Sequence, residues 1–207
     1  MNNRIPYNPS IIEPKWQKKW KDSKIYNVDL DSKNKENYFS LTMFPYPSGD
    51  LHIGHWYAFT PADSYSRFKK MKGFNVLHTQ GFDAFGLPAE NAAISRNINP
   101  MKWTFDNIDN MRGQFNLMGN SYDWSRELIT CTPEYYKWNQ FFFLKMYEKG
   151  IAYRKNGAVW WDPVDQTTLA NEQVVEGKSE RSGADVVRKM MPQWYFKITD
   201  YAEELLE

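Results

Sequence analysis

The sequence predicts an α/β fold in which a parallel sheet forms half of a domain and a small β-rich module follows it. Two apolar, strand-like runs at residues 38–43 and 74–79 flank a helical pattern at residues 56–71. Strand, helix and strand at this spacing are typical of a parallel β-α-β unit. Further along, the dipeptide Asn156-Gly157 separates two short apolar runs, which predicts a β-hairpin and therefore the second module.

Composition limits what the protein can be. With 207 residues, 42% of them hydrophobic, and 9 tryptophans, the chain can bury the core of one ordinary domain plus a small module. The net charge of +1 indicates that, if RNA is the partner, this segment does not supply the main phosphate-binding surface. The lone cysteine, Cys131, excludes an internal disulfide and a cysteine-based zinc site. No apolar run approaches the ~18 residues of a spanning helix, and the first residues lack a signal-peptide pattern, so we expect a cytoplasmic protein outside the membrane.

The chain opens with a predicted helix at residues 10–24, and a polar loop at residues 27–37 follows it. Ser10 and Glu13 have the spacing of a capping box, so we expect Ser10 to be the N-cap. Two tryptophans of this helix fall one turn apart on one face, which favours docking of the helix on the domain.

The turn between the first strand and the next helix holds the most informative residues. Residues 44–55 end with His52 and His55, two of only three histidines in the chain. A proline- and glycine-rich turn between a strand and a helix is where α/β folds bind phosphate groups. Within the helical pattern, Pro61 predicts either a kink or a later helix start, and Gly73 predicts the helix end.

A second polar segment follows the strand run at residues 74–79. Residues 80–91 contain Asp83 at the end of that run and Pro88, which suits the first turn of a helix. Because ligands bind at the carboxyl ends of parallel strands, both segments fall where a site is expected. The alternative for Asp83 is an N-cap of a helix at residues 86–94.

Two aromatic helices are predicted next. Thr104 is expected to cap the first, Gly119 to end it, and its apolar stripe is most simply core packing: Phe105, Ile108, Met111, Phe115 and Met118. The second begins at residues 132–134 and ends at Gly150. After the predicted hairpin, a polar stretch is followed by a renewed strand pattern, at residues 171–189 and 192–198 respectively.

The residues around the histidine pair resemble a known family. His52-Ile53-Gly54-His55 resembles the HIGH signature of class I aminoacyl-tRNA synthetases. Further segments, in the right order, resemble the leucyl members of that class: residues 44–49, 83–91, 123–127, 131–136 and 169–174. Nearly the whole chain is therefore similar to the amino-terminal part of a leucyl-tRNA synthetase. The second family signature, Lys-Met-Ser-Lys-Ser, and the editing and anticodon-binding parts are absent from this sequence, so we expect the chain alone to be incomplete as an enzyme.

The resemblance implies a Rossmann-like catalytic fold and four segments. They are an N-terminal helix and loop, the first half of the catalytic domain, a module like a zinc knuckle, and a return toward the editing-domain insertion: residues 1–37, 38–150, 151–190 and 191–207. The implied activity is leucine–tRNA ligation, in which ATP activates leucine to leucyl-adenylate and the leucyl group passes to tRNA(Leu). ATP with Mg²⁺ is the implied cofactor, and leucine and tRNA(Leu) are the implied partners, the tRNA mostly through parts outside this chain.

The resemblance also implies which residues bind ATP. His52 and His55 are the expected catalytic pair, which contacts the ATP phosphates and stabilises charge on the α-phosphate. Gly54 would let adenine pack against the backbone, and Pro45 and Gly49 complete the ATP set. The alternatives are a histidine pair that only caps a helix and glycines that serve only the turn.

For leucine, the resemblance implies Met43, Phe44, Tyr46 and Asp83. Backbone groups at the strand end would hold the amino acid, Tyr46 would cover its side chain, and the Asp83 carboxylate would bind the α-ammonium group. Core packing is the alternative for the first three residues, and above all for Met43.

Many bacterial relatives carry a zinc knuckle in the small module, and the matching positions here are Asp162, Ser179 and Ser182. Serine is a poor zinc ligand, so we expect no zinc. Two other residues have simple expectations: His78 is a core histidine, and Arg67 belongs to a charged run on a solvated helix face.

Two other functions stay open. Small nucleotidyltransferases also use an H-x-G-H turn, but they have no reason to carry residues 83–91 or the later leucyl-type segments. The third possibility is a non-catalytic fragment, or one subunit of a split synthetase.

Overall fold

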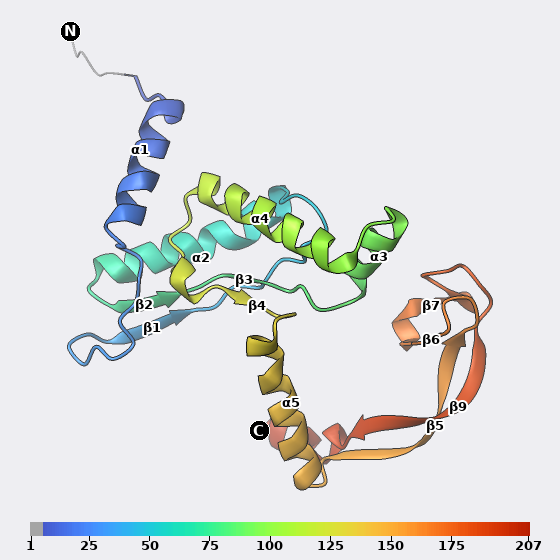
Figure 1. Cartoon of the computed structure of the whole chain (residues 1–207). Helices are drawn as coiled ribbons and strands as arrows, with labels where there is room; N and C mark the ends of the chain where they lie inside the picture. Colours follow the sequence, from blue (N-terminus) through green and yellow to red (C-terminus); the bar gives the residue numbers. More distant parts are fainter. Residues whose placement is uncertain (1–5) are drawn as a thin grey trace. The chain divides into compact units, whose positions relative to one another are not determined.

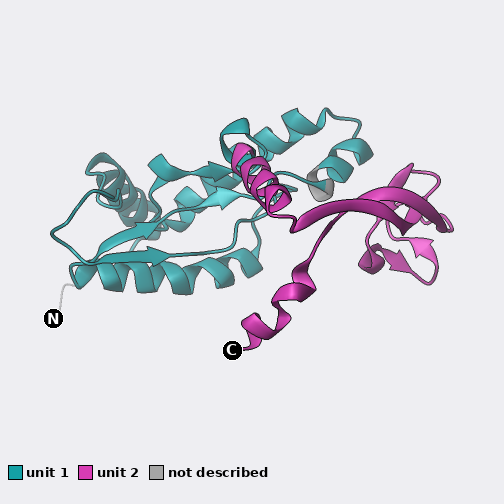
Figure 2. Cartoon of the chain, turned by 90° about the horizontal axis from the view of Figure 1, so that it is seen from below, with its two compact units in different colours: residues 1–136 teal, residues 137–207 magenta. Residues whose placement is uncertain are grey.

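The computed structural model describes residues 6–207, apart from the side chains of residues 87–89. The chain divides into two compact units, Met1–Tyr136 and Lys137–Glu207, which Figure 2 draws in different colours. The division falls inside helix α5 (Pro133–Glu148).

The first unit alternates short strands with longer helices (Figure 1). Its elements in chain order are α1 Pro9–Asp22, β1 Asn37–Ser40, α2 Ile53–Met71, β2 Asn75–His78, β3 Gly81–Phe82, α3 Leu87–Ser95, α4 Pro100–Met118, a 3-10 turn Trp124–Arg126, and β4 Leu128–Ile129. Strands β1 and β2 pair in parallel, and so do β3 and β4. Helix α2 connects β1 to β2 and packs against both. The predicted parallel β-α-β unit and the α/β fold class are confirmed.

Strand β1 is shorter and more exposed than the sequence predicted. It ends at Ser40, which is buried, whereas the side chains of Phe39 and Leu41 are 55% and 74% exposed. The prolines that follow, Pro45 and Pro47, lack the N–H groups that would extend the ladder. Among the described residues β1 pairs only with β2, so its apolar side chains have little to pack against.

The core of this unit lies between helix α4 and the strand ends. Its buried members come from α2, β3, α4 and the segments beside them: Phe59, Phe82, Ala84, Ile108, Met111, Phe115 and Tyr122. The predicted stripe on α4 therefore packs in the core, with Phe105 and Met118 at its margin. Gly119 has a φ of 72° and ends α4 as predicted, because glycine adopts this left-handed conformation without strain.

Two predicted helix caps are wrong, and one of the two alternatives for Pro61 is excluded. The N-cap of α1 is Asn8, whose side chain accepts the Ser10 N–H at 3.1 Å, and the N-cap of α4 is Asn99 rather than Thr104. In both cases asparagine is followed at once by proline, a strong start signal that places the cap earlier than predicted. Helix α2 begins at Ile53, so Pro61 lies inside the helix and does not delay its start.

The second unit is built on a long, two-stranded ribbon with smaller pieces around it (Figure 1). Its elements after α5 are β5 Ala152–Asp162, β6 Thr167–Leu169, a 3-10 turn Asn171–Gln173, β7 Val174–Val175, β8 Lys178–Ser179, β9 Val187–Phe196, a 3-10 turn Ile198–Tyr201, and α6 Ala202–Leu206. Strands β6, β5 and β9 form an antiparallel sheet in that order. Trp194 of β9 packs edge-on against Phe143 and Tyr147 of α5.

The hairpin predicted at Asn156-Gly157 is wrong, because both residues lie within the continuous strand β5, opposite Pro192 and Met191 of β9. A Cβ atom added at Gly157 would lie 1.8 Å from the Tyr195 hydroxyl oxygen. Glycine is therefore needed here for a close cross-strand approach and not for a turn. Strand β9 also runs without a break through the boundary predicted at residues 190 and 191.

Within residues 6–207, no helix combines the length and the apolar character that crossing a membrane requires.

Candidate functional site

The two histidines cap the start of helix α2 and each other. The His52 Nδ1 atom accepts a hydrogen bond from the Gly54 N–H at 3.1 Å, and the His55 Nδ1 atom accepts one from the His52 N–H at 3.1 Å. This reciprocal cap fixes both rings, whose centroids lie 4.0 Å apart. Because each Nδ1 accepts a hydrogen bond, the Nε2 atom carries the proton in each neutral ring and is the free donor.

The environment keeps His55 neutral. Its ring is half-buried and stacks on Phe59, with centroids 6.0 Å apart. Burial first, and then the neighbouring His52, lower the pKa of His55 below its ordinary value. The ring N–H donors of two histidines at a helix N-terminus form a site suited to an anion such as phosphate.

Gly54 is sterically required beside these rings. A Cβ atom at this position would lie 2.9 Å from the Cε1 atom of His52, so a side chain would displace that ring. A Cβ atom at Gly49, in contrast, would meet nothing within 4 Å. Space alone therefore does not explain glycine at position 49.

The loops after β1 and β3 meet at the expected leucine site. The Asp83 N–H donates to the Pro45 carbonyl oxygen at 2.9 Å. A Cβ atom at Gly81 would lie 3.0 Å from the Phe44 ring, so Phe44 packs directly on β3. The structure thus brings Phe44, Pro45 and Asp83 together, as predicted for the ends of neighbouring strands.

Asp83 is not a helix cap. Helix α3 begins at Leu87 with Gly86 as its N-cap, which contradicts the capping alternative for Asp83. The hydroxyl of Thr130 instead lies 3.4 Å from Asp83 Oδ1 and accepts the Ala84 N–H at 2.8 Å. Thr130 therefore holds this loop in place, and no local sequence signal near Asp83 pointed to it.

Met43 and Tyr46 are exposed, at 75% and 56% of their surface, so core packing does not account for either side chain. Within the described part of the chain, no hydrogen bond joins the histidine pair to the group formed by Phe44, Pro45 and Asp83. The site residues thus form two groups, one at the start of α2 and one where residues 43–46 meet the Asp83 loop, rather than one bonded network.

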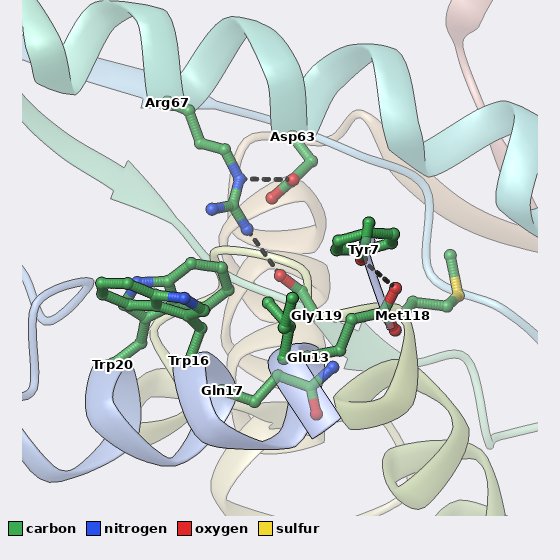
Figure 3. A pocket seen from close by; sticks show the side chains of 10 residues that line it. Tyr7, Glu13, Trp16, Gln17, Trp20, Asp63, Arg67, Met118 and Gly119 are labelled. Carbon is green, nitrogen blue, oxygen red and sulfur yellow. Dashed lines mark hydrogen bonds and ion pairs between the residues drawn. The ribbon is translucent and has the colours of Figure 1, made fainter. Parts of the chain in front are cut away.

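The prediction that Arg67 lies on a solvated helix face is wrong. Its Nε atom donates to Asp63 Oδ2 at 2.8 Å, its other nitrogens donate to the Tyr26 hydroxyl and the Gly119 carbonyl, and its side chain is only 27% exposed. Figure 3 shows Arg67 between Asp63 and Gly119, in a pocket that the tryptophans of α1 also line. Asp63 Oδ1 in turn accepts hydrogen bonds from the Ser121 N–H and hydroxyl. This network ties the segment after α1, helix α2 and the segment after α4 together.

His78 is a buried core histidine, as predicted. It is 2% exposed, and its Nδ1 atom lies 3.3 Å from the Ser121 hydroxyl oxygen. Burial, with the Arg67 charge adding to it, lowers the pKa of His78 to about 4, against the opposing effect of Asp63. The ring is therefore neutral at physiological pH.

The positions that match a zinc knuckle form a hydrogen-bonded cluster. Asp162 is fully buried, and its Oδ2 atom accepts the Ser182 hydroxyl at 2.6 Å. Hydrogen bonds from the Ser179 and Ser182 hydroxyls hold the pKa of Asp162 well below its ordinary value. The cluster also includes Asp165 and Arg181, which the sequence analysis missed. The Asp165 N–H donates to Asp162, the Arg181 N–H donates to the Ser179 hydroxyl, and Arg181 Nε donates to Asp165 Oδ2 at 3.0 Å.

These residues do not fit zinc. The donors are carboxylates and hydroxyls, not the thiolates or imidazoles of structural zinc sites. Both carboxylate oxygens of Asp162 already accept hydrogen bonds, and the Arg181 guanidinium supplies the positive charge beside Asp165. Across the described side chains, no three His, Cys, Asp or Glu residues gather as a metal site would require.

Protein purified without chelator should therefore contain far less than one zinc ion per chain. The reason is the oxygen-only donor set at Asp162, Ser179 and Ser182, whose hydrogen bonds a metal would have to replace. Elemental analysis of the purified chain is the measurement, with a protein of known zinc content run beside it. One zinc per chain would show that the assignment of these positions is wrong.

Known proteins are similar to this chain along almost its whole length. A family model described as "tRNA synthetases class I (I, L, M and V)" matches residues 15–207. Leucine–tRNA ligases of Thermosipho melanesiensis and Deinococcus radiodurans are 60% and 57% identical to it over 97% of the chain. The chain spans about a quarter of the length of these curated relatives, 24% of each.

Solved structures agree with the fold. A LeuRS of Agrobacterium radiobacter, in a ternary complex with tRNA and LeuAMS, matches 97% of this chain with a TM-score of 0.87 and 44% identity, over 26% of its own chain. A methionyl-tRNA synthetase of Mycobacterium tuberculosis matches 83% of this chain with a TM-score of 0.67 and 22% identity, over 34% of its own chain, which supports the fold alone. Because the family model covers nearly every residue from 15 to the end, the chain belongs to the class I tRNA synthetases, the family of the isoleucine, leucine, methionine and valine enzymes.

Proposed function

We propose that this chain is the N-terminal catalytic segment of a full-length leucine–tRNA ligase. The observation that carries the proposal is the turn at residues 44–55, which presents His52 and His55 at a helix start and is hydrogen-bonded to the Asp83 loop. The high identity to leucine–tRNA ligases and the likeness to a LeuRS bound to tRNA and LeuAMS support leucine as the amino acid.

In the proposed first step, a carboxylate oxygen of leucine attacks the α-phosphorus of ATP. The bond from that phosphorus to the bridging oxygen of the β-phosphate breaks, and pyrophosphate leaves. Negative charge grows on the α-phosphate oxygens, and the Nε2–H groups of His52 and His55, whose Nδ1 atoms are used in the helix cap, would stabilise it. When bound with ATP, Mg²⁺ would supply positive charge beside the phosphates.

ATP and leucine would be held by neighbouring parts of the same turn. Gly54 would let adenine pack against the backbone, and Pro45 and Gly49 would line the path to the phosphates. The exposed side chains of Met43 and Tyr46, with Phe44 beneath them, would surround the leucine side chain. The Asp83 carboxylate would bind the α-ammonium group through a charge-assisted hydrogen bond.

In the proposed second step, a terminal hydroxyl of tRNA(Leu) attacks the carbonyl carbon of leucyl-adenylate, and AMP leaves. The chain has a net charge of only +1, so we expect most phosphate contacts with the tRNA to come from other parts of the full-length protein. The proposed location of this reaction is the cytoplasm.

The test of leucine recognition is Asp83→Ala in the full-length protein. Loss of a charged hydrogen bond costs roughly 1.5–3 kcal/mol, so the KM for leucine should rise about tenfold to a hundredfold. The KM for ATP should stay within about twofold, because Asp83 lies on the other loop from the histidines. Leucine-dependent ATP–pyrophosphate exchange measures both constants.

Asp83→Asn is the matched variant, since it keeps the shape and removes only the charge. It should lie between wild type and Asp83→Ala, because the ammonium group then loses its ionic partner but keeps an acceptor. Unchanged exchange in Asp83→Ala would remove Asp83 from the leucine site.

A further inference from the structure

Two amide side chains on helix α4 hold the loop that leads into the histidine pair. The Asn110 Nδ2 atom donates to Asp50 Oδ1 at 2.6 Å, and the Gln114 Nε2 atom donates to the same oxygen at 3.0 Å. The Gln114 Oε1 atom accepts the Leu51 N–H at 2.7 Å. Both ends of the Gln114 amide are thus used on two consecutive residues of the loop.

These amides belong to a helix that packs in the core of the first unit. Asn110 and Gln114 are four residues apart on α4, so they lie one above the other on one face. The next residue after each of them, Met111 and Phe115, is 1% exposed in the core. Leu51 also packs against this core from the loop side.

The loop that Asn110 and Gln114 hold ends directly before the N-cap of α2. Asp50 and Leu51 directly precede His52, which is the N-cap of α2 and whose ring is fixed by its bond to Gly54. A shift of the Leu51 backbone would therefore move the His52 ring, because only the peptide link separates them. Catalytic donors lose much of their effect when they move by about 1 Å.

We infer that Asn110 and Gln114 are positioning residues, which set the place of His52 for the reaction by clamping Asp50 and Leu51. The inference rests on the proposed function, because it assigns the clamp a role in leucyl-adenylate formation. Neither residue touches the reacting atoms, and each acts only through the loop.

The test exchanges donor and acceptor across the clamp. Gln114→Glu turns the Nε2 donor into a carboxylate oxygen that faces the Asp50 carboxylate, so the clamp should open by charge repulsion. In the double variant Asp50→Asn with Gln114→Glu, the new amide at position 50 can donate to the new carboxylate at position 114, which restores this contact with reversed polarity. The Asn110 amide then faces a donor in place of its acceptor, so the recovery is partial. Asn116→Asp, on the exposed face of the same helix, is the control for an added negative charge.

Two measurements separate the clamp from the chemistry. Amide hydrogen exchange of residues 1–207 follows the Leu51 N–H, which should exchange at least about tenfold faster in Gln114→Glu. In the full-length protein, the kcat of leucine-dependent adenylate formation should fall about tenfold to a hundredfold, with the KM for leucine within about twofold of wild type. The double variant should recover part of the loss in both measurements and exceed the single variant in each, and Asn116→Asp should change neither.

The outcomes distinguish this inference from the proposed function. If the wild-type full-length protein forms leucyl-adenylate and Gln114→Glu does so at the same rate, the positioning role is wrong and the function stands. A double variant no better than the single variant would equally overturn the clamp. If the wild type forms no leucyl-adenylate, the proposed function fails, and the inference falls with it.

Discussion

In the full-length protein, His52→Ala and His55→Ala should each slow leucyl-adenylate formation about 10²–10³-fold, the usual effect of removing one donor to a developing charge. Leucine and ATP binding should change little, because these hydrogen bonds strengthen only as charge moves onto the α-phosphate. The structure indicates which ring nitrogen would act in each histidine. Each Nδ1 atom accepts a hydrogen bond in the reciprocal cap, so each Nε2–H remains free for the phosphate. Single-turnover measurement of adenylate formation separates the rate from binding.

His52→Asn is the control that separates catalysis from helix capping. Asparagine is among the best N-caps, so it should preserve the start of α2 that alanine would weaken by about 0.5–2 kcal/mol. Its shorter side chain cannot carry the Nε2 donor to the same place, so the rate should stay low. If His52→Asn restored the rate, His52 would act only as a cap, and a loss confined to ATP affinity would contradict the transition-state role.

Asp63→Ala should destabilise the first unit by about 3–5 kcal/mol, the cost of removing one partner from a largely buried charged pair. Asp63 accepts hydrogen bonds from Arg67 and from both the N–H and the hydroxyl of Ser121, and its side chain is 12% exposed. The substitution leaves the Arg67 charge unpaired and the Ser121 N–H without its acceptor. Native-state hydrogen exchange of amides in residues 6–136 would measure the loss without requiring both units to unfold together.

Asp106→Ala is the matched control for Asp63→Ala. Asp106 pairs with Lys102 on α4 at the same spacing of four residues, but its side chain is 59% exposed and that of Lys102 is 69% exposed. Exposed pairs of this kind contribute less than about 1 kcal/mol. An equal loss in the two variants would show that burial of the Asp63 network adds nothing to stability.

The sequence was a good guide where local chemistry decides the structure. The parallel strands, the end of α4 at Gly119 and the core stripe with Met111 and Phe115 follow from periodicity and glycine, and the structure bears them out. The caps at Ser10 and Thr104 failed because asparagine followed by proline is a stronger start signal a few residues earlier.

Other features depend on partners that lie far away in the sequence. Arg67 sits in a charged run, and only its bonds to Tyr26 and the Gly119 carbonyl explain why it is partly buried. The dipeptide Asn156-Gly157 is typical of a hairpin turn, but here it lies within a strand, where the close approach of Tyr195 from the opposite strand requires glycine. No single-sequence pattern contains these distances.

The candidate site divides in the same way. The histidine pair and the strand ends were predictable from the turn at residues 44–55 and from its resemblance to a family signature. Thr130 and Gln114, which hold the loops from behind, come from distant segments with no motif of their own. Their roles follow from hydrogen bonds that only the folded chain reveals.

The cluster around Asp162 should make the second unit sensitive to other conditions than a zinc knuckle is. A knuckle held by thiolates and zinc opens when its cysteines are oxidised or when the metal is scarce. A cluster of Asp162, Ser179 and Ser182 has no sulfur to oxidise, and we expect it to hold no zinc ion. Its weakness is acid instead: because folding lowers the pKa of Asp162, its contribution to stability is present above the ordinary carboxyl range and is lost as the pH falls through the folded value. We therefore expect the stability of this module to depend on a carboxylate that stays ionised at physiological pH, and not on redox state or zinc supply.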